Sequence, residues 1–299
     1  MQTTFNTPAT PVPSLSSSAM LVELSISYWS GRKMDKSVSK EIETAKHADR
    51  GVASVSKRLL GNCAELDAVQ KFQANVRNFH YAATMPWSDS GLRIVPTARY
   101  FDYHKQITAL QAEFFKLVDA FLAEYEWARA QAQVKLGDMF RPDDYPTVEK
   151  LKEKFRFNVN YIPLPDAGDW RVDLGNEAVE QLRAQYEAAY AKQVEGAMKD
   201  IWKRLFDTLT VLSRQLSDAD ADGKKPKMYQ SVFDRALEII DLMEDCNLTG
   251  DPQMQMAQRK LAQTFRGVSL EAVKDDPALK AETKRSVDEI IAALPSLDM

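Results

Sequence analysis

The sequence predicts a mainly α-helical protein with a minor β component, and three observations support this fold class. Glycine is sparse, at 11 of 299 residues, whereas folds that depend on many tight turns use more. Two long stretches, 97–138 and 176–217, carry apolar side chains at helical spacing. The clearest strand pattern in the N-terminal part is LVELSISYW (21–29), in which apolar and polar residues alternate.

The elements before residue 97 follow from composition and periodicity. Residues 1–20 contain no charge, three prolines and eight Ser or Thr, so we expect a disordered tail rather than a targeting signal. After the first strand, helical patterns cover about 34–60, with an interruption near Gly51, and about 63–84, ending before Pro86. A loop follows, with a short LRIV strand that is a candidate partner for the first strand.

The two long stretches predict two long helices. The first carries a heptad seam with spacings of three and four, which indicates coiled-coil-like packing. The second carries a stripe with a period near that of a straight helix. The seam consists of Tyr100, Tyr103, Ile107, Leu110, Phe114, Leu117 and Phe121. The stripe consists of Tyr190, Val194, Met198, Ile201, Leu205, Leu209, Leu212 and Leu216.

Because these helices have equal lengths and a compact connection, we expect a long antiparallel helical hairpin. The connection, 139–175, reads as a small tip module. Two extended runs around Pro165 and Gly168 predict a β-hairpin in it.

Three further helices are expected at about 228–246, 252–266 and 276–294. The predicted organisation is therefore a tail (1–20), a helical core (21–222) and a C-terminal group of helices (223–299).

The charge balance excludes a protein that holds duplex DNA by overall charge. The chain has 39 basic and 43 acidic residues, a net charge of −4 and an isoelectric point near 5.6. Local basic clusters nevertheless keep a nucleic-acid-binding or DNA-metabolism accessory role as an alternative. The residues expected to contact a single-stranded nucleic acid are Arg32, Lys33, Lys57 and Arg58, and its bases would stack on Trp29 or on aromatic residues of the KFRFNVNY run.

Catalytic motifs give little support to an enzyme. The nucleotide-binding glycine motifs, the serine-hydrolase elbow and the HExxH and CxxC metal motifs do not occur. A third hypothesis places a metal-dependent or acid–base site at His80 and His104, beside Asp89 or Asp102. We expect no resident metal and no cofactor.

The leading hypothesis is a non-enzymatic protein that acts through protein–protein contacts as a homo-oligomer. It rests on the heptad seam and on an exposed tip. The expected contact residues are Tyr161, Trp170 and Arg171 in the tip, and Trp87 in the loop before the short strand. No stretch reaches the length of about 20 apolar residues that a membrane span needs, so we expect a cytoplasmic protein without a membrane partner.

Four segments carry a resemblance to a family. They are 21–42, 79–96, LGDMFRPDDYP (136–146) and FNVNYIPLPDAGDWRVDL (157–174). Through them the chain resembles an uncharacterised family encoded mostly by phages and prophages and known only as a domain of unknown function. The resemblance implies action in the bacterial host cytoplasm and a host or phage protein as partner. Some members are encoded near MoxR-type AAA+ ATPases and von Willebrand factor A-type proteins, which implies an AAA+ ATPase as a candidate partner.

Overall fold

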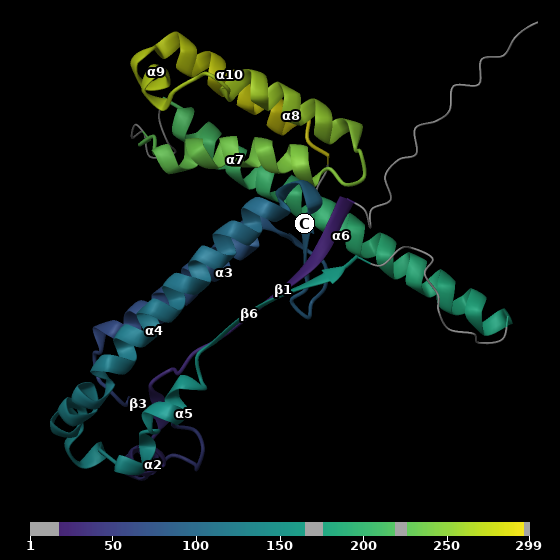
Figure 1. Ribbon diagram of the computed structural model, residues 1–299. Coiled ribbons are helices and arrows are strands. Elements are labelled where there is room, and N and C mark those ends of the chain that lie inside the picture. Colours follow the sequence, from purple (N-terminus) through teal and green to yellow (C-terminus); the bar gives the residue numbers. More distant parts are fainter. Residues whose placement is uncertain (1–17, 165–175, 219–225, 296–299) are drawn as a thin grey trace, which may run out of the picture. The chain divides into compact units, whose positions relative to one another are not determined.

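A computed structural model describes residues 18–164, 176–218 and 226–295, and the side chains of 176–183 lie outside this description. The described residues are 67% helical and include a small antiparallel sheet of four strands, which confirms the mainly α fold class with a minor β part (Figure 1). None of the helices in these residues combines the length and the hydropathy that crossing a membrane requires.

The chain folds as two compact units. Unit 1 comprises Met1–Glu23, Ala83–Phe101 and Tyr161–Met299, and unit 2 comprises Leu24–Ala82 and Asp102–Asn160. Each unit is therefore built from segments that are far apart in the sequence.

Unit 2 is organised by two helices. They are α3 (Ala64–Ala83) and α4 (Tyr100–Leu136). The last residue of α3 and the first two residues of α4 belong to unit 1, and the rest of both helices belongs to unit 2. Most of the predicted heptad seam is buried: Tyr103, Ile107, Phe114 and Phe121 belong to the core. Aromatic side chains of the same unit cover it, with Phe114 against Phe157 and Phe121 against Phe155 and Trp29. Most of the predicted heptad seam is thus buried by side chains of unit 2 itself.

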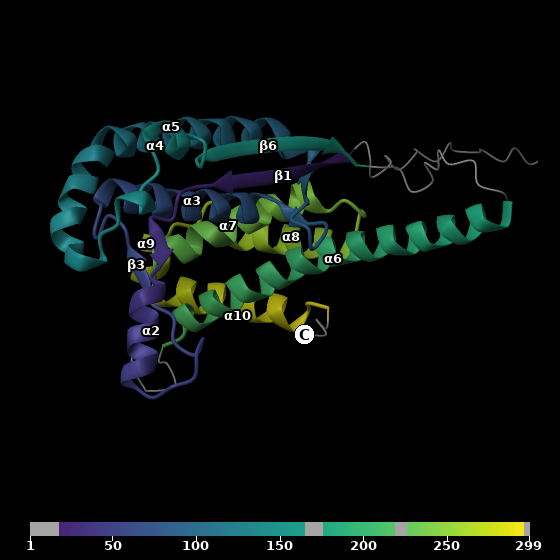
Figure 2. The same cartoon turned by 90° about the horizontal axis from the view of Figure 1, so that it is seen from below.

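The remaining elements of unit 2 are short. They include β2 (Arg32–Met34), α2 (Lys36–Ala45), β3 (Ser56–Arg58), α5 (Val148–Lys152) and most of β6 (Arg156–Pro163). In the sheet, β6 lies next to β1 (Ala19–Ser27), and Figure 2 shows their arrows pointing in opposite directions.

The helical pattern expected over 34–60 is only partly correct. Helix α2 ends at Ala45, and the chain then turns back so that β3 pairs with β2. Gly51 takes a left-handed φ of +94°, and the buried Glu43 carboxylate accepts hydrogen bonds from the Gly51 and Ala53 N–H groups. This local anchoring of the reversal outweighs the helical periodicity.

Unit 1 combines short strand segments with the C-terminal helices. The first half of β1 pairs antiparallel with β5 (Arg93–Pro96), with Leu21 opposite Ile94, and β5 pairs with β4 (Met85–Pro86). The strand expected at LRIV and its pairing with the first strand are therefore confirmed.

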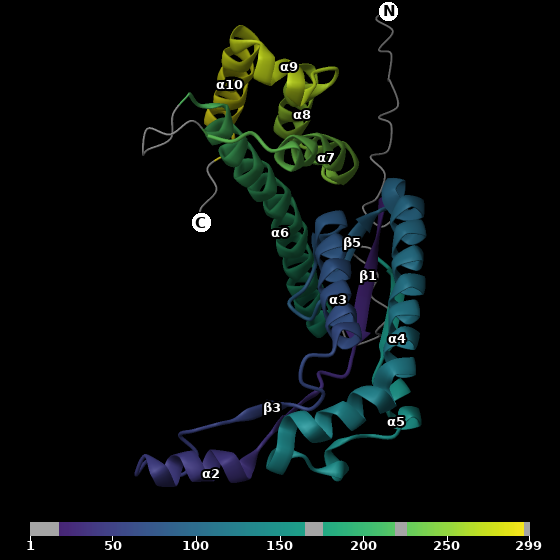
Figure 3. The ribbon, with the colours of Figure 1, turned by 90° about the vertical axis from the view of Figure 1, so that its left-hand side faces the viewer.

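Helix α6 (Asn176–Leu216) is the long helix of unit 1, and α7 (Gln230–Cys246) and α10 (Pro277–Ala292) pack against it. Figures 1 and 3 show the C-terminal helices gathered along the second half of α6. Helix α8 (Pro252–Phe265) packs on α7, and α9 (Leu270–Asp275) is a short helix that the sequence pattern does not predict.

The sequence explains two of the helix starts directly. Helices α8 and α10 both begin at an Asp-Pro pair. The carboxylates of Asp251 and Asp276 accept hydrogen bonds from N–H groups of the first turn, and the proline that follows has no N–H to leave unpaired.

The predicted helical hairpin is not a folding unit. Both long helices exist near the expected bounds, but α4 belongs to unit 2 and α6 to unit 1, together with the helices expected to form a separate C-terminal group. The predicted boundary between 222 and 223 lies outside the described residues, and the helices on either side of it, α6 and α7, belong to the same unit. The first run of the predicted tip hairpin is strand β6, whose neighbour in the sheet is β1. The second run lies outside the described residues.

Candidate functional site

The β2–β3 ribbon of unit 2 brings together the four basic residues that were expected to bind nucleic acid. Its register places Arg32 opposite Arg58 and Lys33 opposite Lys57. Because side chains alternate along a strand, the arginine pair lies on one face of the ribbon and the lysine pair on the other. The two members of each pair are 24 or more residues apart in the sequence, and the ribbon makes them neighbours.

The lysine face is closed by carboxylates. The Lys57 side chain is 3% exposed, and its Nζ lies 2.8 Å from Asp144 Oδ2, 3.2 Å from Asp35 Oδ2 and 2.7 Å from the Met139 carbonyl oxygen. Three acceptors match the three N–H donors of an ammonium group. Asp144 also binds Lys33 Nζ at 2.7 Å through its other oxygen. The lysine face is therefore a satisfied, mostly buried ion-pair cluster.

The cluster shifts the pKa values of its members in the direction that keeps all of them charged. Hydrogen bonds from Ser37 and from the Val38 N–H, together with Lys57, hold the pKa of Asp35 well below its usual range. For Asp144, burial raises the pKa, but the ammonium groups of Lys33 and Lys57 outweigh that effect and the pKa is lowered. The pKa of Lys57 is raised, because the two carboxylates outweigh its desolvation.

The arginine face has different surroundings. Arg32 and Arg58 are both exposed, and neither forms an ion pair with the residues that the structure describes. The guanidinium of Arg58 has a hydrogen bond of 3.5 Å to the amide oxygen of Asn62, close to the outer limit for such a bond.

This geometry corrects the prediction for Lys57, which is a buried structural residue and is not accessible to a nucleic acid. Lys33 is half exposed but already paired with Asp144. Trp29, which was expected to offer a stacking surface, is buried against Phe121 and Tyr125. Of the predicted set, Arg32 and Arg58 are exposed and have no ion pair within the part of the chain that the structure describes.

A second candidate surface lies on α4, on a face that the buried seam does not use. Trp127 is 64% exposed and Val134 is 83% exposed. Exposed alanines at spacings of three and four continue this face, so that a second heptad pattern runs along the helix. We call this set the outer α4 seam; it consists of Ala120, Ala123, Trp127, Ala130 and Val134.

The flanks of the outer α4 seam are acidic. In heptad terms, Asp119, Glu124 and Glu126 occupy the positions next to the seam, and no basic residue occupies the corresponding positions over 119–133. All three carboxylates are exposed, and Glu126 forms an ion pair of 3.5 Å with Arg129. The surface is therefore an apolar strip with acidic borders.

The predicted contact residues in the loop and tip have other positions. Trp87 is 8% exposed, because its indole packs edge-on against Tyr190 in the core of unit 1, which leaves little of it for a partner. Tyr161 is half-buried and packs edge-on against Tyr100 at 5.2 Å, and burial raises its pKa to about 12. Trp170 and Arg171 lie outside the described residues.

The two histidines of the third hypothesis have different surroundings. His80 is buried, with its Nδ1 2.7 Å from the Tyr103 hydroxyl, whereas His104 is exposed. Among the described residues, no group of three His, Cys, Asp or Glu side chains is placed to hold a metal ion. The His80–Tyr103 pair satisfies two polar groups in the core of unit 2.

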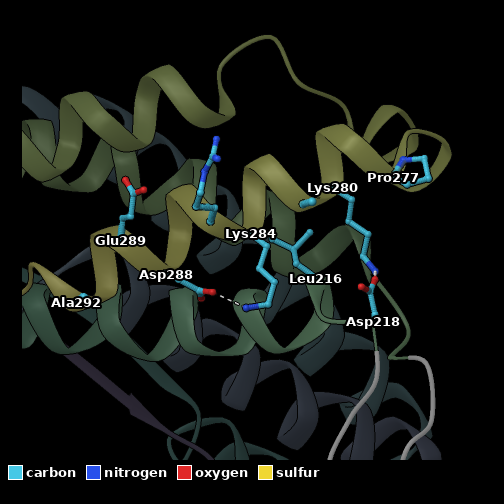
Figure 4. Close-up of a pocket in the computed structure, with 10 residues that line it drawn as sticks. Leu216, Asp218, Pro277, Lys280, Lys284, Asp288, Glu289 and Ala292 are labelled. Carbon is cyan, nitrogen blue, oxygen red and sulfur yellow. Dashed lines mark hydrogen bonds and ion pairs between the residues drawn. The ribbon is translucent and has the colours of Figure 1, made fainter.

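A groove runs along α10 beside the end of α6 (Figure 4). Its charged side chains are mostly paired: Lys284 binds Asp288, and Lys280 donates to Asp218 and to the Ser217 carbonyl oxygen. The groove therefore presents little uncompensated charge. Its lining residues are Leu216, Asp218, Pro277, Lys280, Ala281, Lys284, Arg285, Asp288, Glu289 and Ala292.

Comparison of the chain with protein-family models, with curated proteins and with solved structures gave no match. The resemblance to a phage and prophage family therefore stays a prediction, and the surfaces of the molecule carry the functional argument.

The outer α4 seam was not identified from the sequence. Its signal was present, because Trp127 and Val134 fall seven residues apart on the helix face opposite the stronger seam. Small alanines conceal such a pattern, since they count as weakly apolar and are common in any helix.

Proposed function

We propose that this protein is non-enzymatic and acts by binding another protein through the outer α4 seam. The observation that carries the proposal is the exposure of Trp127 at the centre of a heptad-spaced apolar face. Tryptophan is one of the residues enriched among interface hot spots. The alanines of the seam are small, so a partner side chain can approach the ring closely.

The flanks indicate the chemistry of the partner. A helix that packs along this seam would place its own flanking positions beside Asp119, Glu124 and Glu126. Lysine or arginine at those positions would be attracted, and carboxylates would be repelled. We therefore propose a partner that presents an amphipathic helix with basic flanks.

Two synthetic helices test this proposal. Both carry leucine at the heptad positions that would face the outer α4 seam. At the positions that flank these leucines, one helix has lysine and the other has glutamate. We expect the intact protein to bind the lysine-flanked helix more tightly in fluorescence anisotropy. Trp127→Ala should weaken that binding about tenfold or more, as loss of an interface anchor does.

Met256→Ala is the matched control, since Met256 has the same exposed fraction of 64% but lies on α8 in unit 1. Equal binding of the two helices, or equal binding by Trp127→Ala and the intact protein, would contradict the proposal.

Homo-oligomerisation is a separate part of the proposal. The heptad seam that suggested it is buried within unit 2. A second copy would also bring the same acidic flanks to the interface. Light scattering over a wide concentration range tests this part, and a strictly monomeric species would remove it.

We further propose that the protein acts in the cytoplasm of a bacterial host, with a host or phage protein as partner. An AAA+ ATPase is the first partner to test. Co-purification of a tagged intact protein and its Trp127→Ala variant with a MoxR-type ATPase measures this, and recovery that depends on Trp127 is the expected result.

A further inference from the structure

The arginine face of the β2–β3 ribbon is a feature that the proposed function does not use. Hydrogen bonds join Leu59 N–H to the Gly31 carbonyl and Asp35 N–H to the Val55 carbonyl, at either end of the ribbon. In an antiparallel ladder this alternation makes Arg32 and Arg58 a non-hydrogen-bonded pair. The Cα atoms of such a pair are only about 4.5 Å apart, and their side chains are the closest across the ladder.

Two like charges directly opposite each other destabilise a sheet. On the lysine face the same arrangement is compensated, since Asp35 and Asp144 bind Lys57 and Lys33. On the arginine face no carboxylate of the described residues does so. The pair therefore lacks a stabilising role in the ribbon, and an external anion would supply the missing negative charge.

The surroundings favour an anion with many charges over a single small one. Segment 32–58 contains seven exposed basic residues but only two exposed acidic ones, Glu41 and Asp49. Its other two carboxylates, Asp35 and Glu43, are buried and bind backbone N–H groups. Negative charge is thus turned inward and positive charge outward. The exposed basic residues are Arg32, Lys33, Lys36, Lys40, Lys46, Arg50 and Arg58.

The net charge of unit 2 differs in sign from that of the whole chain. Unit 2 holds 19 basic and 16 acidic residues, although the complete chain has a net charge of −4. The overall charge balance therefore does not exclude a polyanion at unit 2.

We propose that Arg32 and Arg58 bind the phosphodiester backbone of a nucleic acid, independently of the outer α4 seam. Guanidinium groups recognise phosphate oxygens with paired hydrogen bonds, and the exposed lysines of α2 extend the positive surface along a repeating anion. Trp29 is buried, so the site reads phosphates rather than stacked bases, and binding is independent of sequence.

Titration of the intact protein with fluorescein-labelled 25-base-pair duplex and with its single strand, over a series of salt concentrations, tests the proposal. The double variant Arg32→Ala/Arg58→Ala should bind duplexes of different sequence more weakly by a similar factor. Its slope of log affinity against log salt should fall by about 2, as expected for two lost phosphate contacts.

Lys71→Ala/Lys105→Ala is the matched control, because it removes the same charge from exposed positions on α3 and α4. An equal loss of affinity and slope in this control would overturn the proposal, since binding would then depend on total charge alone. A double variant with a Tm at or above that of the intact protein excludes unfolding as the cause; a lower Tm that accounts for the lost binding would overturn the proposal.

Two further outcomes would also overturn it. One is failure of the intact protein to bind either oligonucleotide at low salt. The other is Arg32- and Arg58-dependent binding to vesicles of anionic phospholipid without binding to nucleic acid. Neither result bears on Trp127 and the synthetic helices, so this proposal and the proposed function fail separately.

Discussion

The two faces of the β2–β3 ribbon carry the same type of charge pair in different surroundings. On one face, Lys33 and Lys57 bind Asp35 and Asp144, and Lys57 is buried with every N–H satisfied. On the other face, Arg32 and Arg58 are exposed and have no carboxylate among the described residues. The difference teaches that basic residues adjacent in sequence can have opposite roles: one pair holds the fold, and the other is available to a ligand. Each of the following experiments tests that distinction.

The largest effect is expected for Lys57→Met. It leaves the Asp35 and Asp144 carboxylates without their shared ammonium group. Loss of one partner from a buried charge cluster costs about 3–5 kcal/mol. The free energy of unfolding in urea measures this, with the exposed Lys36→Met as control. A variant as stable as the intact protein would contradict the structural role of the lysine face.

Asp144→Asn should have a smaller effect. The amide keeps the shape of the side chain but removes the charge that faces Lys33 and Lys57, while Asp35 still compensates Lys57. We expect a loss of about 1–3 kcal/mol in the free energy of unfolding. Asp143→Asn is the control, because Asp143 is the exposed neighbour. Equal effects of the two changes would show that the ion pairs of Asp144 do not matter.

The pH dependence of stability should follow the same cluster. The folded-state pKa values of Asp35 and Asp144 are lowered, so their stabilisation is present above the unfolded-state pKa of about 3.9 and is lost as the pH falls below it. The pKa of Lys57 is raised, so its stabilisation is present below about pH 10.4 and is lost as the pH rises further. Thermal unfolding across pH measures both limits. Asp144→Asn should lose less stability in acid than the intact protein does, and an unchanged acid profile would count against the cluster.

The smallest effect, and one of opposite sign, is expected for Arg32→Ala. Removal of one of two opposed like charges should raise the free energy of unfolding, or leave it unchanged, within about 0.2–1 kcal/mol. Lys71→Ala, at an exposed helical position, should leave it unchanged. A clear destabilisation by Arg32→Ala would mean that the arginine face contributes to the fold after all.

Much of the secondary structure could be predicted from the sequence. Local periodicity, together with glycine and proline at the ends of elements, predicts most of the elements. These are the strand near residue 21, the short LRIV strand, both long helices, the helix near 63–84 and the helices in the C-terminal part. The errors occurred where a tertiary contact outweighed the local pattern. Strand β3 exists because β2 pairs with it, and Glu43 anchors the reversal between them.

The candidate sites were less accessible to prediction. The basic residues of the ribbon were identified, but their distinction depends on Asp144, which is 87 residues away from Lys57 in the sequence. Trp87 and Trp29 were expected to be available and are buried, because an aromatic residue in a short loop or at a strand end does not reveal what packs against it.

The sequence by itself determined the fold class, the approximate bounds of the long helices and the existence of local basic clusters. These depend on composition, on periodicity and on interactions within about one helical turn. Only the tertiary structure decided which seam of α4 is buried, which unit each long helix joins, and which basic residues keep their charge exposed. The physical reason is that burial and charge compensation are set by residues far away in the chain, whose proximity exists only after folding.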